Sequence, residues 1–320
     1  MRVAAPKTRR GFFPSAPNRT IPVSDPIAAD AALIRDNRIA LAALILGGAA
    51  IGGSPIFVRL SEVGPLATAF WRVALALIPM LIVSQAKRQK SGVRPAGLAD
   101  CFMLVLPGLF LAADLVTWHL SIRMTSVANA TLLANLAPIF VAAIGWLFLG
   151  LKISRVFLLG LATAMFGIVT LKGGLAGLAH GDLRGDGMAT IAALFYAGYI
   201  LVIGRLRTRF DTLQIMVWST ATAAVCLLPI AFLIEGTMLP PSLFGWLMLI
   251  GLAFISHAGG QVAITYALAY LPPAFSSLTL LLQPVVAAIL AWLLLGEAIG
   301  PAQAIGGAIV LGGILIARRG

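Results

Sequence analysis

Two charged residues, Arg72 and Asp114, lie inside long apolar stretches of this chain. A single charge in such surroundings is costly, so each side chain should face a partner, a ligand or a water-filled cavity. Each residue lies seven positions from the nearer end of its stretch, roughly 10 Å deep along a helix. We therefore expect Arg72 and Asp114 to lie at the same depth in the membrane. They either form a structural ion pair or bind a substrate, with Arg72 holding a carboxylate and Asp114 an ammonium group or an exchangeable proton.

Trp118 follows Asp114 by four residues, so both side chains project from one helix face. An indole ring beside a carboxylate suits an aromatic or zwitterionic ligand, because it can make a cation–π contact with an ammonium group. The alternative is an anchor at the membrane surface, where tryptophan is common.

Two prolines deep in apolar stretches, Pro138 and Pro284, each lie close to an amide side chain, Asn135 and Gln283. Proline leaves the carbonyl four residues earlier without its N–H partner, which makes that carbonyl an acceptor for a ligand. Ordinary helix kinks with interhelical hydrogen bonds are the alternative. A third proline, Pro55, predicts a hinge that acts as a gate.

The C-terminal half supplies further polar and aromatic candidates for a substrate site: Tyr196, Tyr199, Trp218, His257 and Gln261. His257 and Gln261 are four residues apart and would share a helix face.

The elements that must position these residues follow from composition. Apolar residues make up 60% of the chain, charged residues make up 11%, and the mean hydropathy is +1.00, which is unlike a soluble domain. Apolar stretches of about 20 residues recur, each long enough to cross a hydrocarbon layer of about 30 Å as a helix. They predict an all-α membrane protein with ten transmembrane helices, at 38–60, 65–86, 98–121, 126–149, 154–172, 187–204, 212–234, 242–264, 273–295 and 301–317.

The positive charges predict how the chain is oriented in the membrane. The net charge of +12 does not indicate nucleic-acid binding, because the cations lie in the N-terminal segment and in short loops without interleaved aromatic residues. With the N-terminus in the cytoplasm, 18 Lys and Arg residues fall inside and four outside, leaving Arg72 in a span. Both termini are thus expected in the cytoplasm. Residues 1–37 are expected to form a flexible cytoplasmic tail, because most of them are polar or rich in Pro, Arg and Ala. They hold no apolar stretch of the kind found in a cleavable signal peptide.

The chain repeats itself at an offset of 146 residues. Chance likeness between apolar stretches would match Leu with Leu, but it does not explain Pro, Trp and Gly in register. The matched pairs include Pro138 with Pro284, Trp146 with Trp292, Gly150 with Gly296, Gly160 with Gly306 and Gly167 with Gly313.

A repeat unit of five helices is odd in number, so the second copy must be inverted relative to the first. An inverted repeat is the architecture of secondary transporters, whose two halves move about a site near the membrane centre. We assign the first unit to residues 38–172, the connecting loop to 173–186 and the second unit to 187–320.

The two units do not share their charges. Trp218 takes the position of Arg72 in the second unit, and Gly260 takes that of Asp114. We therefore expect one asymmetric site for a small molecule with polar and apolar parts, rather than two equal ion sites.

Short motifs run through both units: Phe70-Trp71-Arg72, Leu136-Ala-Pro138-Ile-Phe with Trp146 and Leu149-Gly150, Tyr266-Ala-Leu268, and Leu282-Gln-Pro284-Val-Val with Trp292 and Leu295-Gly296-Glu297. In combination, and over nearly the whole chain after residue 38, they resemble the EamA family of the drug/metabolite transporter superfamily. One position departs from the family pattern, because Leu151 replaces the acidic residue that the second unit keeps as Glu297.

The resemblance implies export or uptake of small organic metabolites, commonly amino acids, across the bacterial inner membrane. Within the family, the likeness is closest to the YddG-type exporters of aromatic and neutral amino acids. Proton coupling through Asp114 is one way to drive such transport.

Other functions remain open at this point. The substrate could belong to another metabolite or drug class, such as a nucleoside, a vitamin or a cation. An intramembrane enzyme is a distant alternative, since the chain holds no nucleophile elbow, HExxH or nucleotide-binding motif. We expect no metal, no cofactor and no catalysis. The sequence does not define the oligomeric state, the coupling ion or the direction of transport.

Overall fold

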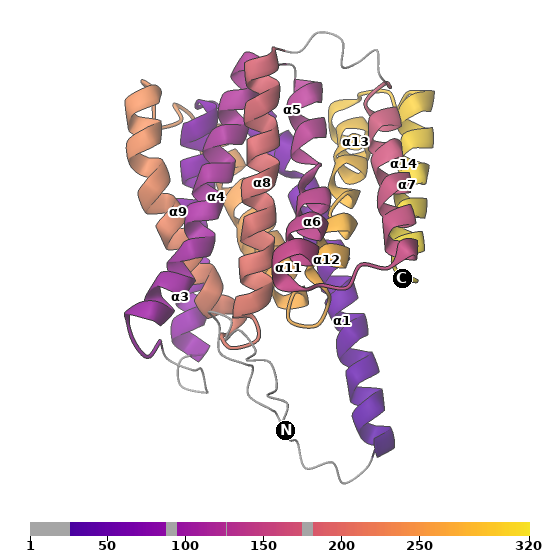
Figure 1. The fold of residues 1–320 in the computed structure, drawn as a ribbon. Coiled ribbons are helices and arrows are strands. Elements are labelled where there is room, and N and C mark those ends of the chain that lie inside the picture. Colours follow the sequence, from indigo (N-terminus) through magenta and orange to yellow (C-terminus); the bar gives the residue numbers. More distant parts are fainter. Residues whose placement is uncertain (1–25, 88–94, 126, 175–181) are drawn as a thin grey trace, which may run out of the picture.

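A computed structural model describes residues 26–87, 95–125, 127–174 and 182–320, and all regular structure in these ranges is helical (Figure 1). The first half contains α1 (Pro26–Gly52), α2 (Ser54–Arg59), α3 (Pro65–Lys87), α4 (Leu98–Met124), α5 (Val127–Ala134), α6 (Ala137–Leu149) and α7 (Arg155–Leu171). The second half contains α8 (Leu183–Leu206), α9 (Thr212–Ile234), α10 (Leu243–Gly251), the π-helix η2 (Leu252–Gln261), α11 (Val262–Ala267), α12 (Pro273–Thr279), α13 (Leu282–Leu295) and α14 (Pro301–Ala317).

Within these ranges, eight helical stretches are long and apolar enough to cross a membrane. They coincide with eight of the ten expected spans. The other two spans are the shorter apolar helices α7 and α14, which reach only about 25 Å each at 1.5 Å per residue. The protein is therefore an all-helical, multi-pass membrane protein, and the count of ten crossings stays a prediction.

The surface of the helices supports this placement. Large apolar side chains are exposed all around the bundle, among them Leu46, Phe148, Phe232, Leu233 and Trp292. Apolar patches on this scale indicate contact with lipid, where helices also satisfy their own backbone hydrogen bonds.

Two of the expected boundaries lie elsewhere. Helix α1 begins at Pro26, inside the segment expected as a tail, and α8 begins at Leu183, inside the expected connecting loop. Residues 1–25 of that tail and 175–181 of that loop lie outside the described residues.

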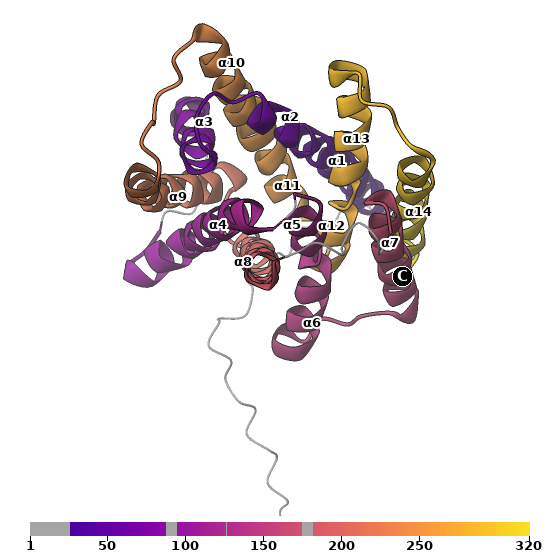
Figure 2. The same ribbon diagram turned by 90° about the horizontal axis from the view of Figure 1, so that it is seen from above.

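Helices from the two halves pack against one another throughout the bundle. Helix α7 lies along α14, α4 along α8 and α3 along α9, and Figure 2 shows the first pair at one edge of the bundle and the last at the opposite edge. The α7–α14 pair is the tightest, because glycines allow backbone contact there. A Cβ on Gly160 would lie 2.5 Å from the backbone nitrogen of Ala317, and one on Gly313 the same distance from that of Ala164.

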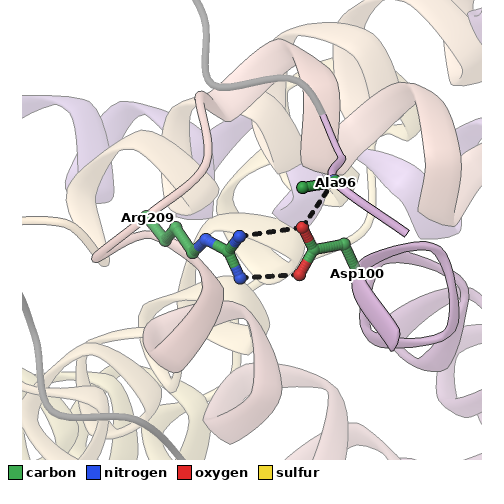
Figure 3. A network of polar contacts seen from close by, with 3 residues as sticks. All are labelled: Ala96, Asp100 and Arg209. Carbon is green, nitrogen blue, oxygen red and sulfur yellow. Dashed lines mark hydrogen bonds and ion pairs between the residues drawn. The ribbon is translucent and has the colours of Figure 1, made fainter. Parts of the chain in front are cut away.

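Polar contacts join the halves near both ends of the bundle. At the end that carries the C-terminus, Arg209 donates two hydrogen bonds to Asp100, at 2.6 and 2.8 Å, and the Asp100 carboxylate also accepts from the Ala96 N–H (Figure 3). At the other end, Arg59 pairs with Glu297. These contacts fix the halves around the space between them.

Candidate functional site

A cavity of about 700 Å³ lies between the two halves. It extends to the helix ends at Leu171–Gly173 and Gly300–Gln303, opposite the end that carries the C-terminus. Seven of the ten residues expected to bind substrate line it, as do the three prolines expected to kink a helix or act as a gate: Arg72, Asp114, Trp118, Asn135, Tyr196, Gln261, Gln283, Pro55, Pro138 and Pro284.

Interrupted helices build the centre of this cavity. Pro138 and Pro284 lie in the first turns of α6 and α13, just after the breaks that end α5 and α12. The residues four positions earlier, Ala134 and Leu280, also line the cavity. Since proline carries no N–H group, the carbonyls of Ala134 and Leu280 lack the N–H donor that a residue four positions later normally supplies in a helix. Equivalent positions of the repeat thus face one another across the site.

A third interruption lies beside the cavity, where α1 ends at Gly52 and α2 begins at Ser54. Pro55 stands in the first turn of α2, as expected for a residue without an N–H to donate. The equivalent helix of the second half, α8, runs without a break from Leu183 to Leu206. Within the described residues, this interruption is therefore a feature of one half only.

Arg72 and Asp114 face the cavity from α3 and α4. The two charges interact electrostatically. Their nitrogen and oxygen atoms do not come within 4.0 Å, however, and the ion pairs among the described residues lie elsewhere. The arrangement therefore leaves both charged groups available to a molecule in the cavity.

Three buried nitrogen atoms of the cavity wall have no hydrogen-bond partner in the protein: Arg72 Nε, Gln261 Nε2 and Gln283 Nε2. Buried donors are almost always paired, and an unpaired one costs about 1–3 kcal/mol. The amide side chains of Gln261 and Gln283 both approach the hydroxyl group of Tyr196, and that of Gln261 also approaches the hydroxyl group of Tyr199, but neither Nε2 atom reaches hydrogen-bonding geometry. This part of the wall is thus rich in donors that suit the oxygen atoms of a ligand.

Aromatic rings flank the charged groups. Trp118 lines the cavity one helical turn from Asp114. Its ring makes an edge-to-face contact with the ring of His119, with 4.8 Å between the ring centroids. Tyr196 also lines the cavity and stacks on Tyr199, 5.9 Å away, on the side of the buried core. An apolar or aromatic group of a ligand would find a surface on these rings.

His257 and Gln261, which were expected on one helix face, have different surroundings in the π-helix Leu252–Gln261. Gln261 reaches the cavity at the end of this segment. His257 is buried and lies 3.0 Å from the hydroxyl of Thr220 in α9. Its polar group is therefore engaged within the protein and does not line the cavity.

Tyr199 and Trp218 also lie outside the cavity. Tyr199 is fully buried, and its hydroxyl donates to the sulfur of Met216 at 3.8 Å. Trp218 is half-buried and packs against the hydrophobic core from α9. Tyr199 lies one helical turn from Tyr196, and Trp218 occupies the repeat position of Arg72, but neither side chain lines the cavity.

The cavity also contains residues that the sequence reasoning passed over, namely Ser54, Lys172 and Gln303. Lys172 follows the last residue of α7. The repeat offers a signal for it, because the offset of 146 pairs Lys172 with another cation, Arg318.

Comparison with known proteins agrees with this architecture. A solved crystal structure superposes on 89% of this chain and 97% of its own, with a TM-score of 0.73 at 16% sequence identity. That likeness supports the fold alone.

Relatives of similar length are named as transporters. An uncharacterized transporter of Archaeoglobus fulgidus is 27% identical over 281 residues, covering 87% of this chain and 96% of the relative. A probable terminal-alkyne amino-acid exporter of Streptantibioticus cattleyicolor is 27% identical over 71% of this chain and 76% of its own. The pseudopaline exporter CntI of Pseudomonas aeruginosa is 27% identical over 52% of this chain and 57% of its own.

The sequence pattern of the EamA-like transporter family matches twice, at residues 38–172 and 183–319. The two matches lie in the two halves of the internal repeat and together cover most of the chain. They confirm the family resemblance that the proline, tryptophan and glycine motifs indicated. This protein belongs to the EamA-like transporter family.

Proposed function

We propose that this protein exports small zwitterionic metabolites, with neutral and aromatic amino acids as the substrate class. The observation that carries the proposal is the set of unpaired donors, Arg72 Nε, Gln261 Nε2 and Gln283 Nε2, in the same cavity as the Asp114 carboxylate. A zwitterion satisfies both groups at once. Its carboxylate accepts from the donors, and its ammonium group faces Asp114.

The remaining surface of the cavity suits an amino-acid side chain. Trp118 and Tyr196 offer aromatic faces, and Leu111, Leu115 and Leu281 extend the apolar wall. The volume of about 700 Å³ lies within the usual range for small-molecule sites. A nucleoside or a simple cation would leave either the donors or the carboxylate without a charged partner.

The names of two relatives support export as the direction. One is a probable terminal-alkyne amino-acid exporter and the other is an exporter of pseudopaline. We place the protein in a bacterial inner membrane with both termini in the cytoplasm, as the distribution of Lys and Arg predicts. Alternating access follows from the inverted repeat, and exchange of a proton at Asp114 is the proposed coupling.

The experiment that tests this function measures how three small molecules of similar shape change the melting temperature of the purified protein. L-phenylalanine carries both charges, 2-phenylethylamine lacks the carboxylate and 3-phenylpropionate lacks the ammonium group. Ligands that bind the folded state raise its melting temperature. We expect L-phenylalanine to raise it most, and liposomes containing the protein to exchange labelled for unlabelled L-phenylalanine.

A matched pair of tryptophan variants provides the control. Trp118→Leu removes a ring from the cavity, whereas Trp292→Leu removes one that is 51% exposed on the outer surface of α13. The first should abolish most of the L-phenylalanine shift and the second should leave it intact. Equal shifts with all three probes, or none with any amino acid tested, would exclude the zwitterion proposal.

A further inference from the structure

A second cavity, of about 450 Å³, lies at the end of the bundle that carries the C-terminus. The middle of α1, the α6–α7 loop, the start of α12 and the end of α14 form its wall. Apolar side chains cover much of that wall, among them Leu41, Phe157, Leu271 and Phe275. The cavity is therefore shaped for a molecule with an apolar part.

Three cations surround this second cavity: Arg38 from α1, Lys152 from the α6–α7 loop and Arg318 after α14. None of them pairs with an acidic side chain in the described part of the chain, and no Asp or Glu residue lines the cavity. Like charges around a concave apolar wall focus a positive potential and attract anionic groups.

The repeat relates this cavity to the mouth of the large one. Leu171, Lys172, Gly300 and Gln303 line the large cavity where it reaches the helix ends. At the offset of 146, their equivalents are Ala317, Arg318, Ser154 and Phe157, and all four line the second cavity. Because the repeat is inverted, the second cavity occupies the position of a mouth on the opposite side of the protein.

One short helix separates the two cavities. In α12, Ala274 and Phe275 face the second cavity, whereas Ser277 and the following Leu280 and Leu281 face the large one. The helix has only seven residues and is interrupted on its C-terminal side by the break before α13. A small displacement of α12 would therefore connect the two spaces.

We propose that the second cavity is the entry vestibule of the transport path and that Arg38, Lys152 and Arg318 bind the carboxylate of an incoming substrate there. The inference rests on the proposed function for its substrate class. The two mouths are not equal, since the large cavity has one cation, Lys172, at its mouth, whereas the vestibule has three. A substrate carboxylate thus has more cations to bind at the side from which export begins.

The test measures how fast charged thiol reagents reach α12. The variant Ala274→Cys is made in a full-length background in which Cys101 and Cys226 are replaced by Ser, and it is placed in phosphatidylcholine nanodiscs. An anionic methanethiosulfonate carrying a sulfonate should react at least about tenfold faster than its trimethylammonium analogue, each rate being normalised to a free thiol. Phe275→Cys provides a second reporter if Ala274→Cys does not fold.

Two charge variants separate local recognition from overall charge. Replacing Arg38, Lys152 and Arg318 by Gln together should remove the preference for the anionic reagent. Replacing Arg35, Arg155 and Arg319 by Gln removes the same charge at the same end but touches no lining residue, so the preference should persist. Equal losses in both triple variants, or no preference at the start, would overturn the proposal.

Transport decides whether the vestibule belongs to the path. In liposomes, labelling Ala274→Cys should block exchange of L-phenylalanine, whereas labelling Thr208→Cys, in an exposed turn at the same end, should not. Unimpaired exchange after Ala274→Cys labelling contradicts the proposal. If unlabelled protein exchanges no L-phenylalanine, the proposed function fails, and the reagent preference alone then decides for or against the anion site.

An anionic lipid is the competing occupant. Nanodiscs of phosphatidylglycerol, with rates normalised to Thr208→Cys, should show the same preference at Ala274→Cys as phosphatidylcholine. If phosphatidylglycerol suppresses the preference for the anionic reagent, the three cations bind a lipid headgroup and the vestibule proposal is overturned.

Discussion

Arg72 and Asp114 face one cavity from neighbouring helices, α3 and α4, without forming a direct ion pair. Opposite charges held in a bundle interior normally pair with each other, because isolated charges there are costly. Here each group instead remains available to the cavity. This geometry favours the ligand-binding interpretation of the two residues over the structural ion pair.

Asp114→Asn is the first prediction. The change keeps the size and hydrogen-bonding capacity of the side chain but removes the charge that an ammonium group or a proton would balance. Loss of a charged hydrogen bond costs about 1.5–3 kcal/mol, so L-phenylalanine exchange should fall roughly tenfold to a hundredfold. The pH dependence of the remaining exchange should also flatten. Exchange in liposomes between pH 5 and 9 measures both, and a wild-type rate with a wild-type profile would remove Asp114 from the mechanism.

The second prediction concerns the unpaired amide donors. Replacing Gln261 or Gln283 by Leu removes a buried N–H group that has no partner in the protein. Since an unpaired donor is destabilising, each variant should melt at a higher temperature than the parent without ligand. Each should also bind L-phenylalanine about two- to tenfold more weakly, because a hydrogen bond worth about 0.5–1.5 kcal/mol is lost.

His257→Leu is the control for this pair. His257 lies in the same π-helix as Gln261, but its ring contacts Thr220 rather than the cavity. Its replacement should lower the melting temperature and leave the affinity unchanged. Opposite signs of the stability change in Gln261→Leu and His257→Leu are thus the expected signature. A Gln261→Leu variant that is less stable and binds normally would refute the role of its amide.

The third prediction tests the contact between Asp100 and Arg209. The carboxylate side chain is 11% exposed and receives two hydrogen bonds from the guanidinium, whose side chain is 44% exposed. Because Asp100→Asn removes the charge that both hydrogen bonds use, it should lower the free energy of unfolding. Arg209→Lys should recover only part of this, since lysine lacks the planar pair of donors. A double-mutant cycle in detergent measures the coupling, and additive effects would show that the two side chains are energetically independent.

The interrupted helices of the fold were predictable because proline marks them. Pro138 and Pro284 lack an N–H group, and they stand within three residues of the breaks in the fourth and ninth spans. Pro55 likewise lies in the first turn of the short helix α2, after the break at Gly53. The repeat, the proline positions and most cavity residues on these helices could thus be inferred from residue types and spacing alone.

The positions that were harder to predict depend on packing between helices. A spacing of four residues places His257 on the same side as Gln261, but it does not show that Thr220 of α9 lies close enough to engage the His257 ring. Tyr199 and Trp218 have side chains of the right type, but the neighbouring helix decides whether each meets the cavity or the core. Glycine 260 shows the same effect, since a Cβ there would lie 3.0 Å from the carbonyl oxygen of Gly47 in α1. The position equivalent to Asp114 therefore has no room for a side chain.

The last prediction compares two adjacent glycines in the middle of α14. A Cβ on Gly313 would lie 2.5 Å from the backbone nitrogen of Ala164 in α7, whereas one on Gly312 would have no atom within 4 Å. Alanine at Gly312 should raise stability by about 0.5–1 kcal/mol, because glycine is a poor helix former. Alanine at Gly313 has the same gain in helix propensity but must push α7 away, at a cost of about 1–3 kcal/mol. Melting temperatures of the two variants in detergent should therefore shift in opposite directions. Equal shifts would show that α7 and α14 do not pack by backbone contact at this point.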